Sequence, residues 1–110
     1  SVGSIIMKQA GIKKVSLELG GNAATYIDGS ADICMAAKRC TFGAFVNSGQ
    51  VCISLQRIFV HEKVYDLFAR TIAKESRELK VGSPYEEDTF MGPLIDSDSL
   101  RRAEEWIASA

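Results

Sequence analysis

Cys52 is the side chain of this sequence best suited to covalent chemistry. It follows a run of small and polar residues, Asn47 to Gln50, that interrupts an otherwise apolar segment. A thiol reacts as its thiolate, and lowering its usual pKa of about 8.5 takes a helix end or a set of backbone N–H groups. A helix that stops before Gly49 would turn Cys52 toward a cleft. This pattern is typical of a nucleophile, although a cysteine without such a context is more often a buried structural thiol.

Glu18 is the second candidate for chemistry. It lies near the end of a short alternating segment and is followed closely by Gly20 and Gly21. Paired glycines let the backbone approach a ligand or another chain segment, and ligands of open α/β sheets bind beyond the carboxyl ends of strands. Glu18 could therefore face a site. The alternative is a structural carboxylate that accepts N–H groups of the turn after it.

The remaining candidates are weaker. His61 is the only histidine, but a strand that begins near residue 55 would carry it about 20 Å along its axis at about 3.3 Å per residue. We therefore expect His61 at the surface and not as a base for Cys52. Cys34 and Cys40 lie in an apolar helical stretch and are predicted core residues. Three cysteines without C-x-x-C spacing argue against a disulfide framework and a zinc site, so no metal is expected.

The elements that would position these residues alternate between helix and strand. Hydrophobic periodicity predicts the helices 2–10, 31–46, 62–79 and a final one capped by Asp96 or Ser97, and the strands 14–19, 23–27 and 55–60. Gly11 is the expected stop of the first helix, and Ser30 the expected cap of the second, which we expect to be largely buried. The final helix would bury Leu100, Ala103 and Ile107. We predict an α/β fold with a parallel-type sheet flanked by helices.

Composition excludes several classes of partner. The 110 residues include 13 Lys and Arg against 14 Asp and Glu, so neither a nucleic acid nor an anionic membrane is indicated. Apolar stretches fall short of the ~20 residues that span a bilayer, and no signal peptide is recognisable. A cytoplasmic protein is expected. Because the chain starts at Ser1 without an initiator Met, we expect it to be a piece of something longer.

Two motifs together resemble a known family. Leu17-Glu18-Leu19-Gly20-Gly21-Asn22-Ala23 is followed by F-x-x-x-G-Q-x-C, which ends at Cys52, 34 residues after Glu18. This pair resembles the active-site signatures of the aldehyde dehydrogenase superfamily. The segments Met91 to Ile95 and Arg57 to Val60 also have similar sequence there. The resemblance makes a nucleophile at Cys52 and a base at Glu18 more probable than their structural alternatives.

The resemblance implies a reaction and a domain assignment. Residues 1–19 would end a cofactor-binding domain, and 20–110 would form the N-terminal half of a catalytic domain. Cys52 would attack an aldehyde, with its backbone N–H as one oxyanion donor. NAD or NADP would accept hydride, and Glu18 would activate the water that hydrolyses the thioester. Ser1, Val2, Gly3 and Leu19 match cofactor contacts of the family.

Three hypotheses follow. The first is an oxidoreductase for a small-molecule aldehyde, a homo-oligomer at full length, whose fragment alone has little or no activity because positioning and oxyanion groups are incomplete. The second is a thiol-dependent hydrolase or acyltransferase that uses Cys52 and Glu18 without a dinucleotide. The third is a non-catalytic fragment that self-associates through exposed apolar surface.

Overall fold

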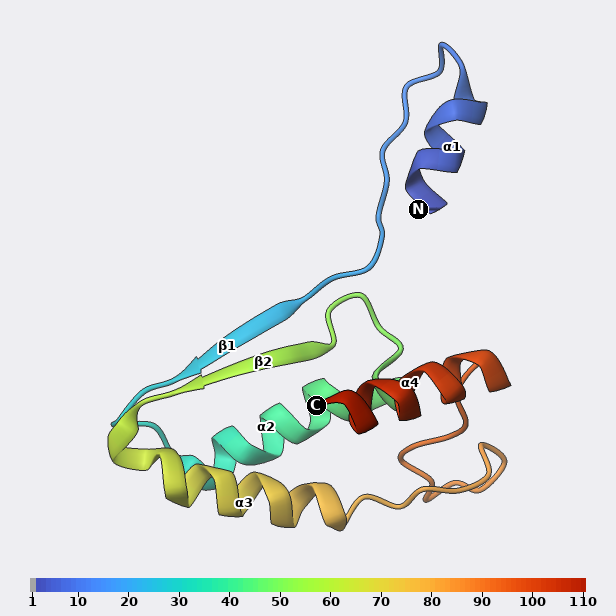
Figure 1. The fold of residues 1–110 in the computed structure, drawn as a ribbon. Helices are drawn as coiled ribbons and strands as arrows, with labels where there is room; N and C mark the ends of the chain where they lie inside the picture. Colours follow the sequence, from blue (N-terminus) through green and yellow to red (C-terminus); the bar gives the residue numbers. More distant parts are fainter. Residues whose placement is uncertain (1) are drawn as a thin grey trace.

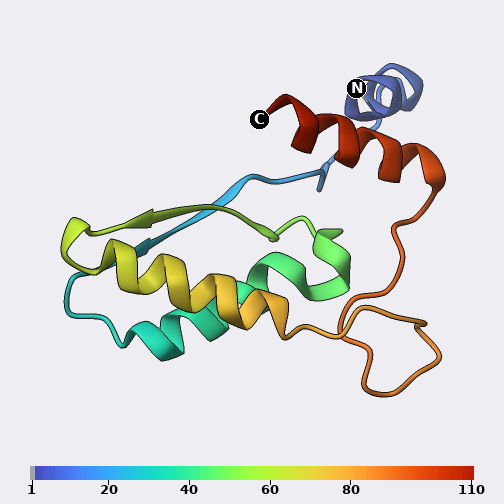
Figure 2. The same ribbon diagram turned by 60° about the horizontal axis from the view of Figure 1, so that its bottom comes forward.

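The computed structural model describes residues 2–110 and shows a small parallel sheet covered by two helices (Figure 1). The elements in chain order are α1 (Val2–Ala10), β1 (Ala23–Ile27), α2 (Ile33–Phe45), η1 (Val46–Gly49), β2 (Leu55–Val60), η2 (Glu62–Val64), α3 (Tyr65–Arg77) and α4 (Ser97–Ser109). β1 and β2 pair in parallel, with Ala23 opposite Leu55 and Ile27 opposite Val60. α2 connects the strands, and α2 and α3 lie on the same face of the sheet (Figures 1 and 2). The predicted α/β class is confirmed.

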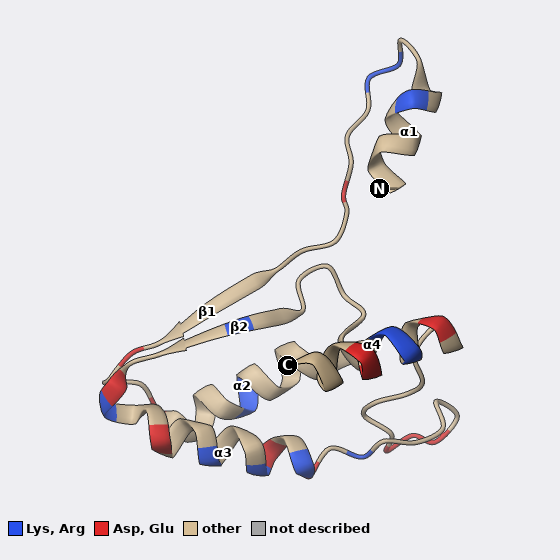
Figure 3. Cartoon of the chain, viewed as in Figure 1, with Lys and Arg blue, Asp and Glu red and all other residues tan. Residues whose placement is uncertain are grey.

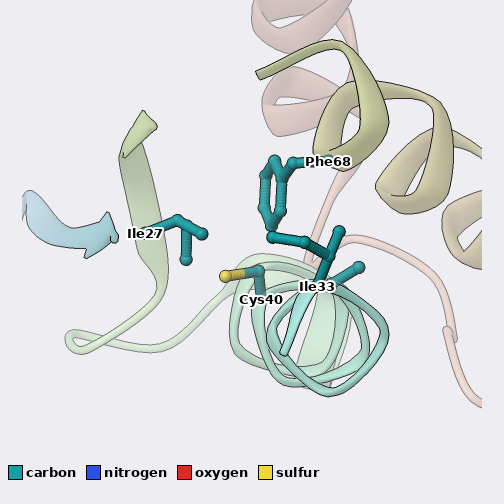
Figure 4. Packing of buried hydrophobic residues seen from close by; sticks show 5 residues of the cluster. Ile27, Ile33, Cys40 and Phe68 are labelled. Atoms are coloured by element: carbon teal, nitrogen blue, oxygen red, sulfur yellow. The ribbon is translucent and has the colours of Figure 1, made fainter. Parts of the chain in front are cut away.

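The core lies between the sheet and these two helices. It consists of five buried apolar residues: Ile27, Ile33, Ala37, Cys40 and Phe68. In Figure 4, Ile33 and Cys40 of α2 face Ile27 of β1 and Phe68 of α3. Burial raises the pKa of the Cys40 thiol, because the thiolate would lose its hydration.

α2 is less buried than its wide apolar stripe suggested. The prediction that Cys34 belongs to the core is wrong, because Cys34 is exposed. One residue beyond Ile33, it is rotated about 100° around a helix of 3.6 residues per turn, which takes it off the core face. Met35 and Phe42 are also exposed, by 59% and 55%. A single sheet and α3 thus cover only one stripe of α2.

The start of α2 also differs from the prediction. The helix begins at Ile33, and its N-cap is Asp32, whose carboxylate accepts the Met35 N–H at 3.0 Å. Ser30 is not a cap: its hydroxyl donates to Asp28 at 2.6 Å within the preceding turn. That hydrogen bond, together with the one from the Ser30 backbone N–H, lowers the pKa of the Asp28 carboxyl. The longer acceptor side chain of Asp32, two residues later, satisfies one of the free N–H groups of the first turn, that of Met35.

The predicted strand 14–19 is wrong, since this segment is extended but unpaired among the described residues. A strand requires a hydrogen-bonded neighbour, and both described strands pair only with each other. The predicted alternation is nevertheless present. Leu17 and Leu19 both pack against Gly3 of α1, whereas Glu18 between them is exposed. Gly11, which ends α1, has the expected positive φ of 63°.

Charged side chains gather on α3, α4 and the loop between these helices (Figure 3). α3 begins at Tyr65, after η2, and not at Glu62 as the periodicity indicated. In the loop, Lys80 forms ion pairs with Glu86 at 2.8 Å and with Asp88 at 2.6 Å. Because these ion pairs are exposed, they contribute little to the free energy of folding, and their main effect is to fix the conformation of the loop.

A large apolar surface remains uncovered. α4 was predicted to bury Leu100, Ala103 and Ile107, but Leu100 is 50% exposed, Ile107 is 78% exposed, and Ala103 is half-buried. The accessible surface is 8759 Å², against about 6,000 Å² for a typical folded protein of 12.0 kDa. The radius of gyration is 17.5 Å, against about 13 Å for a compact domain of this length. Within residues 2–110, no helix is both long and apolar enough to cross a bilayer.

Candidate active site

Cys52 lies on an exposed turn that connects η1 to β2. The Ser54 N–H donates to the Val51 carbonyl at 2.9 Å and closes the turn. Ser54 itself is buried, and its hydroxyl donates to the Ala44 carbonyl at 3.2 Å. This hydrogen bond ties the turn to the last residues of α2. The Cys52 side chain is therefore exposed to solvent, while the hydrogen bond of Ser54 to Ala44 holds the backbone of its turn.

The loop before Cys52 has an unusual backbone. Asn47, Ser48 and Gly49 have φ angles of 53°, 57° and 73°. Left-handed conformation costs most residues with a Cβ about 1–2 kcal/mol, so Ser48 is strained, whereas Asn47 is a residue type that tolerates this region. Hydrogen bonds between Asn47 and Gln50 hold the loop: the Gln50 N–H donates to the Asn47 carbonyl at 3.0 Å, and the Asn47 amide donates to the Gln50 carbonyl at 3.1 Å. The predicted helix end and turn are confirmed.

A distant segment supports this loop. The Ser48 hydroxyl donates to the Gly92 carbonyl at 2.8 Å, and the Ile95 N–H donates to the Gln50 side-chain oxygen at 2.9 Å. Sequence reasoning noted Met91 to Ile95 only as a family-like stretch and missed these contacts. No local signal could have revealed them, because both partners in 92–95 are backbone groups.

The Glu18 motif meets the Cys52 motif at Gly21. A Cβ on Gly21 would collide with the backbone carbonyl oxygen of Cys52, so only glycine permits this approach. The Arg57 guanidinium donates to the Asn22 carbonyl at 3.1 Å and fixes the neighbouring residue. Since three residues span at most about 11 Å, the Glu18 backbone lies within that reach of Gly21.

The two motifs thus lie side by side at the end of the sheet where both strands begin. Glu18 precedes β1, and Cys52 precedes β2. Because the strands are parallel and begin in register, both residues lie at the amino ends of the strands and not beyond their carboxyl ends. Glu18 is exposed in this chain.

The residues expected to contact a cofactor include Leu19, next to Glu18, and Val2 and Gly3 of α1. A Cβ on Gly3 would lie 2.8 Å from the Leu19 Cδ1 atom, so the start of α1 packs directly on Leu19. Leu19 is 47% exposed, and Val2 is 67% exposed. Ser1, the fourth expected contact, lies outside the described residues. The structure brings Gly3 and Leu19 together and leaves an apolar surface next to Glu18.

Comparison with known proteins identifies the family of this chain. A sequence model described as the Aldehyde dehydrogenase family matches residues 1–110. The chain belongs to the aldehyde dehydrogenase family. It is 44% identical over 109 residues to 3-sulfolactaldehyde dehydrogenase of Priestia aryabhattai, and 45% identical over 106 residues to lactaldehyde dehydrogenase of Methanococcus aeolicus. These alignments cover 99% and 96% of the chain but 23% of each relative.

Solved structures agree with this assignment. Succinate-semialdehyde dehydrogenase from Burkholderia pseudomallei matches with a TM-score of 0.90 at 39% identity, over 97% of this chain and 23% of that protein. A glyceraldehyde-3-phosphate dehydrogenase from Methanocaldococcus jannaschii, solved with NADP, matches with a TM-score of 0.92 at 37% identity, over 97% and 24%. This aldehyde dehydrogenase chain thus spans about a quarter of the length of its relatives.

His61 lies away from the thiol in this aldehyde dehydrogenase chain, as predicted. It follows β2, whereas Cys52 precedes that strand. Its Nδ1 atom accepts the Lys63 N–H at 3.2 Å and caps η2, which makes the ring structural. Within residues 2–110 no group of three or more His, Cys, Asp or Glu side chains could hold a metal ion.

One hollow lies beside the loop that precedes Cys52. It has a volume of about 470 Å³, and Gln50, Ile95 and Trp106 are among its lining residues. A second hollow of about 450 Å³ lies between Gly92 and Leu100. Neither is lined by Cys52 or Glu18. In this aldehyde dehydrogenase chain Cys52 is therefore exposed and lines neither hollow.

Proposed function

We propose that these residues are the nucleophile-bearing part of an NAD(P)+-dependent aldehyde dehydrogenase that oxidises an aldehyde to a carboxylic acid. The observation that carries the proposal is the contact of Gly21 with the Cys52 carbonyl. It brings together two motifs that are far apart in the sequence, one with a thiol and the other with a carboxylate. Covalent oxidation followed by hydrolysis requires both groups at one site.

Cys52 and Glu18 would act in sequence. The Cys52 sulfur attacks the aldehyde carbon, and the resulting oxyanion accepts a hydrogen bond from the Cys52 N–H, for which no described residue is an acceptor. NAD(P)+ would accept the hydride from the thiohemiacetal carbon, which leaves a thioester on Cys52. Glu18 then takes a proton from the water that attacks this thioester. The carboxylic acid leaves and the thiol is regenerated.

The cofactor residues fit this assignment. The half-exposed Leu19 side chain, beside the start of α1, offers the apolar surface that a nicotinamide ring would cover. α1 has no acidic residue in its first turn, so its N-terminal N–H groups would meet an anionic ligand without repulsion. On this basis residues 1–19 complete a cofactor-binding domain, and 20–110 begin a catalytic domain.

The wider identity of the protein follows from its relatives. Lactaldehyde and 3-sulfolactaldehyde dehydrogenases are among them, so short 2-hydroxyaldehydes are the first substrates to assay. We infer a cytoplasmic homo-oligomer at full length, in which further elements cover the apolar surface and complete the substrate and cofactor sites. For that reason the isolated 110-residue chain is expected to be inactive.

Glu18→Gln and Cys52→Ala test the mechanism in the full-length protein. Glu18→Gln should give a single burst of NAD(P)H, about one per active site, with steady-state turnover lowered about 100-fold, because thioester hydrolysis loses its base. Cys52→Ala should give neither burst nor turnover. Glu62→Gln and Cys34→Ala, which change exposed residues of the same types, should match the wild type.

Two results would contradict this proposal. One is full NAD(P)+-dependent turnover by Cys52→Ala. The other is an acyl group on Cys52 that forms from an ester but never from an aldehyde and NAD(P)+, which would support a thiol-dependent hydrolase or acyltransferase instead.

A further inference from the structure

Gln50 connects two segments on either side of the Cys52 loop. Its side-chain Nε2 donates to the Asn47 carbonyl at 3.3 Å, and its Oε1 accepts the Ile95 N–H at 2.9 Å. Gln50 and Ile95 are 45 residues apart in the sequence. A single amide therefore contacts both the strained loop and the segment that supports it, two residues before Cys52.

Ser48 makes a parallel connection. Its hydroxyl donates to the Gly92 carbonyl at 2.8 Å, in a half-buried position. Ser48 and Asn47 hold positive φ angles that residues with a Cβ avoid. Such a conformation persists only where the surroundings over-determine it. The two side-chain contacts to 92–95 supply that constraint from outside the loop.

We propose that Gln50 is a positioning residue that, with Ser48, ties the nucleophile loop to Gly92–Ile95 and thereby sets the direction of the Cys52 sulfur. The inference rests on the proposed function and extends it to a residue that touches neither the aldehyde nor the cofactor. The chain continues from Gln50 through Val51 directly to Cys52, so loss of the contacts to Gly92 and Ile95 lets the loop shift as a whole and turns the thiol away from its attack position.

The kinetic consequence differs from that of a binding residue. A displacement of about 1 Å at a reacting atom can lower a rate about 100-fold. Gln50 variants should therefore lower kcat by about 10- to 100-fold. The KM for the aldehyde should change less than about threefold, since the displaced group acts in the chemical step.

Two variants and a control, made in the full-length protein, test this. Gln50→Met keeps the length of the side chain and removes both hydrogen bonds. Ser48→Gly removes the hydroxyl but favours the positive φ, so it keeps the fold intact even where Gln50→Met does not. Gln56→Met is the matched control, because Gln56 is exposed on β2 and makes no side-chain hydrogen bond within the described residues.

The measurements are kcat, KM and the rate of Cys52 alkylation by iodoacetamide from about pH 6 to 10, followed by peptide mass spectrometry. Gln50→Met and Ser48→Gly should show the loss of kcat and an altered pH profile of alkylation, with Gln56→Met unchanged. Wild-type profiles and a kcat within about twofold in both variants would overturn the inference, as would an equal loss in the control. If the wild type oxidises no aldehyde, the proposed function fails, and the alkylation profile alone still decides the role of Gln50.

Discussion

The contact between Gly21 and Cys52 leads to a sharp prediction for Gly21→Ala. The added methyl would overlap the Cys52 carbonyl oxygen, which belongs to the backbone and cannot rotate away. Gly20 is the matched control, because a Cβ there meets no atom within 4 Å and its φ is not in the left-handed region. The two variants make the same chemical change at adjacent positions, so any difference reports the contact alone.

The size of the effect follows from the overlap. Restoring ordinary van der Waals separation requires the two backbone segments to part by about 1 Å, a displacement that can cost about 100-fold in rate. Overpacking of this kind lowers the free energy of unfolding by about 1–3 kcal/mol. Gly20→Ala should instead be neutral or stabilising by about 0.4–1 kcal/mol, because it restricts the unfolded chain.

Burst kinetics show which segment moves. If the Cys52 turn shifts, the burst of NAD(P)H in the full-length protein slows about 100-fold. If the Glu18 segment shifts, the burst persists and only the steady-state rate falls. The reasoning would be refuted if Gly21→Ala matched Gly20→Ala within about twofold in both phases and had the same unfolding midpoint.

Three further predictions concern the scaffold. A hydrogen bond from Ser99 lowers the pKa of Asp96, the N-cap of α4. This stabilisation is present above the unfolded pKa of about 3.9 and is lost as the pH falls through the folded value. The protection factors of the α4 amides in hydrogen exchange should therefore fall below about pH 4 in the wild type but not in Asp96→Asn. Phe68→Ala should lower the free energy of unfolding by about 3–5 kcal/mol in urea titrations, whereas Leu67→Ala, at an exposed position of the same helix, should cost less than about 1 kcal/mol. The isolated 110-residue chain should form concentration-dependent oligomers in sedimentation experiments, because it exposes roughly 2,800 Å² more than a compact protein of its mass; a monodisperse monomer at about 100 μM would contradict this.

Elements set by local sequence were predicted to the residue. The predicted bounds of α1, β1 and β2 agree with the structure, because hydrophobic period, Gly11 and the Asp28-Gly29 turn all lie within or beside the element they define. A parallel-type sheet was likewise expected, and β1 pairs with β2 in parallel. Predictions that concerned burial succeeded only where the covering element belongs to the described chain, as for Cys40.

Two of the wrong predictions share a physical cause. The segment 14–19 has the alternation of a strand but pairs with no other strand within residues 2–110, and α4 has the apolar stripe of a packed helix but leaves Leu100 and Ile107 exposed. Periodicity reports which face would be buried, and burial itself requires a second surface. The prediction for Cys34 failed for another reason: the apolar stripe of α2 is wide, and only Ile33, Ala37 and Cys40 within it belong to the buried core.

Some features of the candidate site are likewise visible in the sequence, and others are not. Residue types and motif spacing predict Cys52 and Glu18 as the reactive residues, since reactivity belongs to side chains. What holds them is mostly backbone: the carbonyls of Cys52 and Gly92, the N–H of Ile95 and the bare Cα of Gly21. Carbonyl and N–H groups occur along the whole backbone, so they leave no mark in a sequence, whereas Gly21 is visible there as one of two paired glycines. Ser48, Gln50 and Gly21 contact these backbone groups through their side chains or, for Gly21, through the lack of one. Although they take no part in the chemistry, their substitution should therefore change the position of Cys52 most.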